Sequence, residues 1–592
     1  MGKFSGVINL NNESIPKDKI LQIWSRELFN DTIEMDKSFL IGLNNHNDVV
    51  GNEESIYNDK DLLVIADLRI DNLDGLKENL KCIQSKSLEI ILHSYKKWGI
   101  DFLKYINGEF AIFIFDKQRN LCFLARDSFG LKSLFYIKKG HNLFFSTELK
   151  FLEMLQETTS FNKEYFINYI YNQATPPNIQ TPFNNIFRVE KATCLEISKE
   201  KLIKNVYWEL LYKPINYKRS SDYVEHFRDI FSKVILNQSN TYGKVSIMMS
   251  GGLDSTSIYG IAKQLRGEEV FPVSNVYDIY KEDDERPYIK LILDQYGEKN
   301  HKFIISDELW ILKNYFQHKI LDEPCINTLS YSLVHENLKA AKNGGATVVL
   351  SGYAGDQVFG YNPEYISNDL RNLNIVGFFN ESKKLARFRN ETLIYVIRNY
   401  GIKGLFNTDE KSPVLSEYAN NFILSKKNKK IFKSKINNSF KYIQRSQGFT
   451  MTRSIAESLG MEVRFPFLDR ELVEFLYNIP IQQKINNATT KVLLRNSMRG
   501  IVPDPILDQQ GKSSDDLLLF QGFKIEWDTI AKAYRGSLLA ELGIINLEDF
   551  KNQMLMYKHG VLSKGMDYFA TLEAELWLKR KVGDVSCPSL QY

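Results

Sequence analysis

Cysteines are few in this sequence, and long apolar runs are absent from it. The 592 residues include five cysteines, Cys82, Cys122, Cys194, Cys325 and Cys587, which are scattered and form no CxxC pair. Their number and spacing exclude a disulfide framework, so the reducing cytoplasm is the expected location. No apolar run approaches the roughly 20 residues of a membrane span, and the first residues do not resemble a secretion signal.

Three kinds of motif are also missing. The eight histidines show no zinc-ligand spacing. Lysine and arginine exceed aspartate and glutamate by only four charges, too few to indicate a nucleic-acid partner. Neither the G-x-x-x-x-G-K-[ST] phosphate loop nor the G-x-G-x-x-G dinucleotide fingerprint occurs. The composition, 43% hydrophobic and 25% charged, is that of a globular protein, and its length predicts two or more domains.

The first 205 or so residues are rich in β-type sequence. Residues 110–126 predict a hairpin with its loop at 117–120, and residues 88–99 have the apolar spacing of an amphipathic helix. Strands with intercalated helices indicate an α+β domain with at least two layers. The short β-type runs are residues 62–70, 108–116, 121–127 and 142–148.

The rest of the chain alternates between strand and helix patterns. A polar stretch at 213–221 predicts a linker, and a helix is expected at about 255–266. This alternation indicates an α/β domain built on a parallel sheet. The expected strands are residues 245–249, 270–277 and the apolar start of 347–356.

Two glycine turns follow strands of this expected sheet. Ligands of parallel sheets bind beyond the carboxyl ends of the strands, which places residues 250–255 and 351–356 on one rim. A strand, a glycine turn and a helix N-terminus form an anion cradle from free backbone N–H groups. A later segment, about 365–445, is more helical and polar, and it contains the basic run 426–435.

The first of these turns reads S-G-G-L-D-S, which matches the pyrophosphate loop of ATP pyrophosphatases. Further segments resemble asparagine synthetase-type proteins in order and separation, among them "NGEFAIFIFDKQRNLCFLARDSFGLKSLFY" and "EVRFPFLDRELVEFLYNIP". The resemblance implies an inactive glutaminase-like α+β domain of the Ntn-hydrolase type at 1–210. An α/β PP-loop synthetase domain at 211–592 would follow, with a helical insertion at about 365–445. Such proteins adenylate a carboxylate and pass it to an amine.

The resemblance also implies ATP and Mg²⁺ and assigns site residues. Asp254 and Asp356 match the Mg²⁺ ligands, and magnesium prefers few carboxylates together with phosphate oxygens. Lys512 matches the lysine that stabilises the intermediate of acyl transfer, although Gln509 stands where the family often has arginine. The positions implied around the nucleotide are Met248, Ser250, Gly251, Gly252, Leu253, Asp254, Ser255, Asn275, Ser351, Gly352 and Lys491.

The glutaminase-like part lacks the group that would attack glutamine. Glutamine-dependent members carry a cysteine nucleophile where this chain has Gly2, and glycine has no side chain to attack with. The carboxamide pocket of those members uses an "NGE" turn, which "ADLRIDN" at 66–72 replaces here. We therefore expect a folded but catalytically silent domain, with the amine supplied as free ammonia or by the substrate itself.

The second glycine turn favours an amine on the substrate. Asparagine synthetases show S-G-E-G-x-D, whereas this chain has Tyr353 at the third position of S-G-Y-A-G-D. This is similar to β-lactam synthetase, in which the tyrosine takes part in deprotonating the attacking amine. A tyrosine can do this only if its pKa is lowered or if it relays a proton to a carboxylate, for which Glu381 is one candidate among several. The block "DDERPY" at 283–288 also resembles ring-closing relatives.

Four functions remain after these arguments. The preferred one is a lasso peptide cyclase, which adenylates an Asp or Glu side chain of a precursor core peptide and closes a macrolactam with the N-terminal amine. Its expected partners are a leader-binding protein and a leader peptidase. The extra helical, basic segment favours a peptide over a small molecule. The alternatives are a β-lactam synthetase-like enzyme, an ammonia-dependent asparagine synthetase, and a nucleotide-sensing scaffold, which the intact motifs disfavour.

Overall fold

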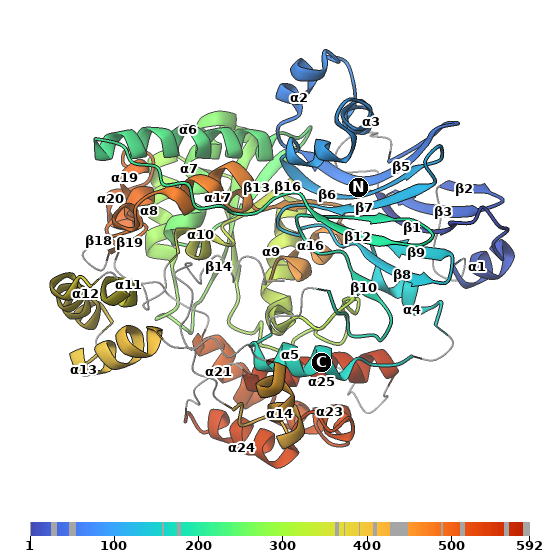
Figure 1. Cartoon of the computed structure of the whole chain (residues 1–592). Helices are drawn as coiled ribbons and strands as arrows, with labels where there is room; N and C mark the ends of the chain where they lie inside the picture. The colour runs from blue at the N-terminus through green and yellow to red at the C-terminus, as the bar shows by residue number, and fades with distance from the viewer. Residues whose placement is uncertain are drawn as a thin grey trace.

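The computed structural model places most of the chain in three regions, two sheet domains and a helical cluster (Figure 1). Lys512 and residues 427–435 of the basic run lie outside the part that it describes. The described residues are 2–24, 32–45, 55–156, 159–174, 179–360, 366–371, 373–389, 391–405, 411–426, 448–486, 489–509, 516–561 and 567–583.

Within the described residues, the N-terminal region contains two antiparallel sheets of six strands each. Their facing sides share a core in which the rings of Phe113 and Phe145 stack at 4.0 Å between centroids. The first sheet has the order β10 (Phe187–Arg188), β8 (Phe135–Lys139), β9 (Asn142–Ser146), β1 (Gly2–Asn9), β3 (Phe39–Asn45) and β2 (Thr32–Asp36). The second has the order β12 (Leu202–Val206), β11 (Thr193–Ile197), β7 (Leu121–Arg126), β6 (Gly108–Asp116), β5 (Leu62–Ile70) and β4 (Ile56–Asn58).

Helices cover the outer faces of these sheets. The predicted β6–β7 hairpin is confirmed with its loop at 117–120, and the predicted helix is α3, Ser87–Trp98. Helices α2 (Leu73–Leu80) and α3 pack on the second sheet, and α1 (Lys17–Trp24) and α4 (Leu149–Glu153) on the first. The predicted α+β domain of several layers is therefore confirmed.

The second region is the predicted parallel sheet, with five strands in the part of the chain that is described. Strand β13 lies at its centre and pairs with β16 so that Met248 is opposite Ser351. The chain builds outward from β13 on one side before it returns to add β16 on the other, so the boundary between them is a topological switch point. The order is β15 (Lys302–Ile305), β14 (Val270–Val276), β13 (Lys244–Met248), β16 (Ala346–Ser351) and β17 (Glu462–Arg464).

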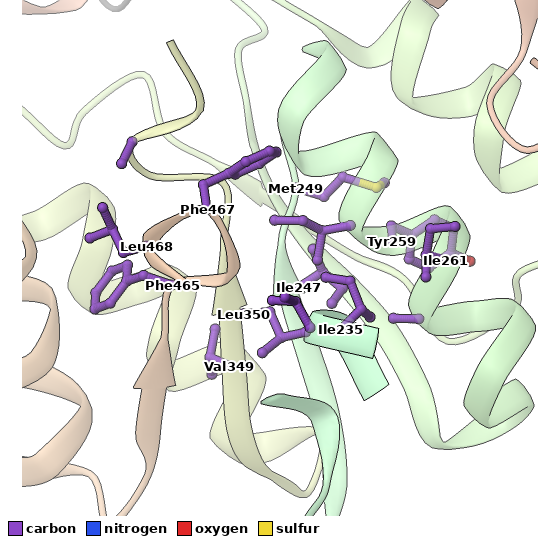
Figure 2. Close-up of a cluster of buried hydrophobic side chains, with 14 of the residues drawn as sticks. Ile235, Ile247, Met249, Tyr259, Ile261, Val349, Leu350, Phe465, Phe467 and Leu468 are labelled. Carbon is purple, nitrogen blue, oxygen red and sulfur yellow. The ribbon is translucent and has the colours of Figure 1, made fainter. Parts of the chain in front are cut away.

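Apolar packing holds this sheet between its helices. Ile247 of β13 and Leu350 of β16 are fully buried, and Figure 2 shows them beside Ile235 of α6 (Ser220–Ser239). Tyr259 of α7 (Leu253–Arg266) and Phe467 belong to the same cluster. Because β-branched residues in β13 and β16 face helices on both sides, the strands are rigid supports for the turns that follow them.

The third region is a helical cluster that joins distant parts of the chain. Helix α5 (Lys163–Tyr171) packs against α25 (Asp567–Val582), where the ring of Trp577 lies 6.1 Å from that of Phe166. The indole N–H of Trp577 donates to the carbonyl of Leu321 at 2.9 Å. None of the helices in the described ranges is long and apolar enough to cross a membrane.

The remaining helices complete the layers around the parallel sheet and the helical cluster. The described part of the segment predicted as helical, about 365–445, is indeed largely helical. It contains α11 (Ser367–Arg371), α12 (Ile375–Phe388), α13 (Leu393–Val396) and α14 (Glu417–Lys426). The others are α8 (Arg286–Tyr296), α9 (Tyr331–Asn343), α10 (Gly355–Phe359), α16 (Gly448–Ser458), α17 (Arg470–Asn478), α18 (Ile481–Lys484), α19 (Val492–Ser497), α20 (Asp504–Leu507), α21 (Asp516–Ile525), α22 (Trp527–Ala533), α23 (Leu538–Glu541) and α24 (Leu547–Lys558).

A buried carboxyl in the helical cluster makes stability depend on pH. Glu573 of α25 is 1% exposed and accepts a hydrogen bond from the Tyr315 hydroxyl at 2.9 Å. Burial disfavours its charged form and raises the pKa of Glu573 to about 8. Because the pKa in the folded protein exceeds that in the unfolded chain, its contribution to stability is complete in acid and is lost as the pH rises through about 8.

Glu573→Gln is therefore expected to make unfolding less sensitive to pH. Glutamine keeps an acceptor for Tyr315 and carries no charge at any pH. At pH 9 we expect the Tm of the variant to exceed that of the wild type by a few degrees, on the order of 2–4 °C. Thermal unfolding followed by circular dichroism at pH 6 and pH 9 measures this, with the exposed Glu541→Gln as the control. Equal pH dependence in wild type and Glu573→Gln would contradict the prediction.

Candidate active site

The predicted pyrophosphate loop connects β13 to α7. The helix begins at Leu253, two residues before the predicted start, so Asp254 and Ser255 lie in its first turn. Ser255 Oγ accepts from the Ser250 amide and donates to the Ser250 carbonyl, both at 3.1 Å, and the Gly252 amide donates to Ser250 Oγ at 3.2 Å. These two hydroxyls therefore shape the loop and accept the amides of Ser250 and Gly252, so the candidate anion-binding groups are the backbone N–H groups at the start of α7.

Gly251 lies where α8 approaches the loop most closely. A Cβ added there would stand 2.9 Å from Cβ of Tyr288 and 3.0 Å from Cβ of Glu285, so only glycine fits. The Gly251 amide donates to Glu285 Oε2 at 3.0 Å. A carboxylate of the protein thus contacts a donor of the loop that is predicted to hold phosphate.

The second turn leaves β16 beside the first. Ala354 caps α10 in the left-handed conformation (φ 73°), and Gly355 begins the helix. A Cβ at Gly355 would stand 2.4 Å from Cγ of Asp254, so this glycine lets the two turns meet. Another close approach is at Gly352, where a Cβ would lie 3.2 Å from Cβ of Asp254.

One ammonium joins the two predicted metal ligands. Lys491 Nζ lies 2.8 and 2.6 Å from the two carboxylate oxygens of Asp254 and 2.6 Å from Oδ1 of Asp356. Burial disfavours the charged lysine, but the two carboxylates outweigh burial and raise the pKa of Lys491. The side chain of Asp356 is half exposed, and that of Lys491 is 9% exposed, so one side of this cluster faces solvent.

The predicted site positions beside these charges have different surroundings. Leu253 belongs to the apolar core, so it can offer a ligand only its backbone. Met248 is half-buried at the end of β13. Asn275, in β14, donates to the Leu333 carbonyl at 3.5 Å, while its Oδ1 is buried with no hydrogen-bond partner in the described part of the chain. That unpaired oxygen is available to a ligand amino group.

Tyr353 lies in the second turn, and its ring contacts helix α16. Its ring packs edge-on against Phe465 at 5.8 Å and Phe449 at 6.3 Å. Glu381, one candidate for its carboxylate partner, forms an ion pair with Lys384 on α12 at 3.0 Å.

Ion pairs join the glutaminase-like domain to the parallel-sheet domain. Lys3, next to Gly2 in β1, lies 3.4 Å from Glu148 and 2.9 Å from Glu457 of α16. Burial favours the neutral acid, but the Lys3 ammonium outweighs burial and lowers the pKa of Glu457 to about 2. These side chains, with the Lys132–Asp67 ion pair at 2.9 Å, line a cavity of about 110 Å³ between the domains.

The segment that replaces the "NGE" turn also forms ion pairs. Arg69 contacts Asp71 at 2.7 Å, Glu109 at 3.1 Å and Glu462 of β17 at 3.3 Å. Arg453 of α16 contacts Glu109 as well. The polar groups at this end of the sheets are therefore paired with one another and with the parallel-sheet domain.

Sequence reasoning missed two of these groups. Glu285 lies in the "DDERPY" block, which was noted as a resemblance without a role for this residue. Its position directly before a proline-initiated helix is a signal that could have placed it on the sheet rim. Lys3 follows the position of the missing nucleophile, and a lysine in an otherwise uncharged strand signals an oppositely charged partner.

The donor set fits ATP with a divalent cation. Asp254 and Asp356 already converge on one cation, the Lys491 ammonium, and two carboxylates suit Mg²⁺ when phosphate supplies further oxygens. Backbone N–H groups at the start of α7 suit phosphate. Asp254 and Asp356 would hold the metal, and the bound metal would neutralise the charge that develops on the leaving pyrophosphate.

Gly355→Ala tests how closely the two turns must meet. The added methyl requires the Asp254 carboxylate to move, while alanine suits the start of a helix, so we expect stability to change little. Binding of the Mn²⁺ complex of a non-hydrolysable ATP analogue should weaken at least about tenfold, or 1.4 kcal/mol. Gly75→Ala, in open space on α2, is the matched control. Unchanged nucleotide affinity in Gly355→Ala would show that the contact is unimportant.

Comparisons with known proteins match the two sheet domains of the chain. A family model described as asparagine synthase matches residues 226–517, and one described as a glutamine amidotransferase domain matches residues 50–208. Both matches agree with the two sheet domains described above.

Curated relatives agree with these matches. A glutamine-hydrolysing asparagine synthetase of Bacillus subtilis (number 3) is 27% identical over 474 residues, which are 74% of this chain and 72% of that protein. A second from B. subtilis (number 1) is 24% identical over 492 residues, 78% and 76% of the two chains. A putative one from Methanocaldococcus jannaschii (number 2) is 29% identical over 326 residues, 52% of this chain and 62% of its own length.

Proposed function

We propose that this chain, an ATP-dependent amide ligase that is similar to the asparagine synthase family over residues 226–517, is a lasso peptide cyclase. It would adenylate an Asp or Glu side chain of a core peptide and release pyrophosphate. The N-terminal amine of the same peptide would then displace AMP and close a macrolactam. A leader-binding protein and a leader peptidase would deliver the peptide.

The contacts of Lys3 are the main support for the proposal that the substrate, and not glutamine, supplies the amine. The relatives named above hydrolyse glutamine, whereas this chain has Gly2 at the position that the resemblance assigns to the nucleophile. Directly after it, the Lys3 side chain links Glu148 to Glu457 across the domain boundary. Charged pairs line the cavity between the domains, which supports a structural role for the first domain and an amine from the substrate.

The remaining machinery suits activation of a carboxylate. Backbone donors after β13 would bind the pyrophosphate, and Asp254 and Asp356 would hold Mg²⁺. Tyr353 would take part in moving a proton from the attacking amine, and Lys512, outside the described residues, would stabilise the acyl-transfer intermediate. Tethering the amine to the activated acyl group makes the second step intramolecular, which supplies much of its rate.

A peptide substrate is favoured over a small β-amino acid by the helical segment at about 365–445. Its described part places α11, α12 and α13 outside the parallel sheet, where they add surface, whereas α14 packs in the helical cluster (Figure 1). Arg371, Lys383, Arg387 and Lys403 give this segment a basic character. A β-lactam synthetase-like reaction remains the second candidate, because Tyr353 fits both ring-closing reactions.

Release of AMP with different acceptors distinguishes the candidates. The purified protein, MgATP and a synthetic peptide with a free N-terminal amine and an internal Asp or Glu are expected to give AMP and a product lighter by one water. Aspartate with ammonium chloride, and a β-amino acid with an internal carboxylate, test the other reactions. AMP formed only with aspartate and ammonium would overturn the proposal, as would glutamate released from glutamine in stoichiometric amounts.

A further inference from the structure

We propose that the nucleotide site carries built-in substitutes for its own ligands, and that Lys491 and Glu285 thereby select the metal-complexed nucleotide over free metal or free nucleotide. Lys491 occupies the place of a cation between the two metal-binding carboxylates. Glu285 occupies an anion's place on the pyrophosphate loop. The inference rests on the assignment of this site to MgATP and is independent of which acid is activated or which amine attacks.

The substitute for the cation is held by several short contacts. The ammonium of Lys491 touches both carboxylate oxygens of Asp254 and one of Asp356 at 2.6–2.8 Å. Lys491 itself is the N-cap residue of α19 and has a positive φ of 55°, which is rare for a residue with a side chain. This backbone position directs the side chain to the carboxylates. A free dication must therefore compete with a charge that is already bound.

The substitute for the anion lies on the loop itself. Glu285 accepts the Gly251 amide at 3.0 Å, and its Cβ would be 3.0 Å from a Cβ at position 251. Carboxylate and phosphate oxygens accept the same backbone donors, so free pyrophosphate must displace Glu285 and also meets its negative charge.

The complex of metal and nucleotide binds without the cost of competing with Lys491 alone or with Glu285 alone. A dication displaces Lys491 from the carboxylates, and the released ammonium can then pair with a phosphate oxygen. The triphosphate displaces Glu285 from Gly251, while the accompanying metal offsets the repulsion from the acid. Metal and nucleotide therefore bind with positive coupling, each raising the affinity for the other by the same factor.

The first experiment measures binding of Mn²⁺ alone by electron paramagnetic resonance. Lys491→Met leaves two carboxylates without their shared cation, and the affinity for Mn²⁺ in the absence of nucleotide should rise at least about tenfold. Lys491→Gln, which keeps a polar end, should behave in the same way if methionine disturbs folding. The exposed Lys281→Met is the control for the loss of one positive charge. Unchanged or weaker Mn²⁺ binding in both folded Lys491 variants would overturn the proposal.

The second experiment measures metal-free pyrophosphate by isothermal titration calorimetry in the presence of EDTA. Glu285→Gln keeps an acceptor for Gly251 but removes the charge, so the affinity should rise at least about fivefold. Glu282→Gln, three residues earlier and exposed, is the matched control. If Glu285 only orients the loop, Glu285→Gln will bind pyrophosphate no more tightly than the wild type, and the proposal fails. Because neither readout involves an acid or an amine, failure here is distinguishable from failure of the proposed cyclisation.

Discussion

Replacing Asp254 or Asp356 with asparagine is expected to lower AMP formation by about a thousandfold or more. Each carboxylate lies within 2.8 Å of the Lys491 ammonium, which places the two acids within reach of one metal ion. Asparagine keeps the shape of the side chain but removes the charge that a divalent cation requires. A thousandfold loss corresponds to about 4 kcal/mol, which is the size of effect expected when transition-state charge is no longer neutralised.

The same substitutions should leave the fold intact. Asp356 is half exposed, and Asp254 loses a contact with one lysine but keeps its place in the first turn of α7. AMP is measured by chromatography with the peptide substrate, and thermal unfolding is recorded alongside. Asp504→Asn, which breaks only an exposed pair with Arg499, is the control and should keep full activity. An Asp254→Asn enzyme that retains more than a tenth of the wild-type rate is incompatible with a metal ligand at this position.

Tyr353→Phe is expected to stop ring closure while adenylation continues. The substitution removes only the hydroxyl, and the remaining ring can still pack against Phe449 and Phe465. Loss of a positioned proton-transfer group lowers a rate by about 100-fold to 10,000-fold. The macrolactam should therefore form at least about 100-fold more slowly, whereas the acyl-adenylate should still appear.

Hydroxylamine separates these two steps, because it captures the adenylate as a hydroxamate without help from the enzyme. Mass spectrometry should find wild-type amounts of peptide hydroxamate with Tyr353→Phe and little macrolactam. The exposed Tyr418→Phe is the control. A parallel fall in hydroxamate and macrolactam would assign Tyr353 to adenylation and would remove the main argument for a ring-closing reaction.

Sequence patterns predicted those parts of the molecule that depend on neighbours in the chain. Strands β5 and β6 have the predicted bounds because alternating and β-branched residues between turn residues define a strand locally. The strand, turn and helix at 244–266 were predicted for the same reason, although the helix begins two residues earlier. Parallel pairing of β13 with β16 then brings Asp254 and Asp356 to one rim, as predicted.

Contacts between distant residues could not be predicted in the same way. Lys491 was expected near the nucleotide, but its bridge between two carboxylates depends on the placement of three separate turns. The approach of Glu285 to Gly251 depends on how α8 packs against the loop. Lys3 and Glu457 are more than 450 positions apart in the sequence, and only the docking of two domains explains why these charged side chains meet and are partly buried.

The packing of α25 against α5 has a consequence for how the protein can be divided. The last described helix completes an apolar core begun by residues of the first 200, so the two ends of the chain are locked together. A protease that cuts the connection between β12 and α6 would leave fragments that stay associated and elute as one species. Removal of α25, by contrast, would uncover Phe166 and Phe183, and the shortened chain would aggregate although every residue of the nucleotide site was retained.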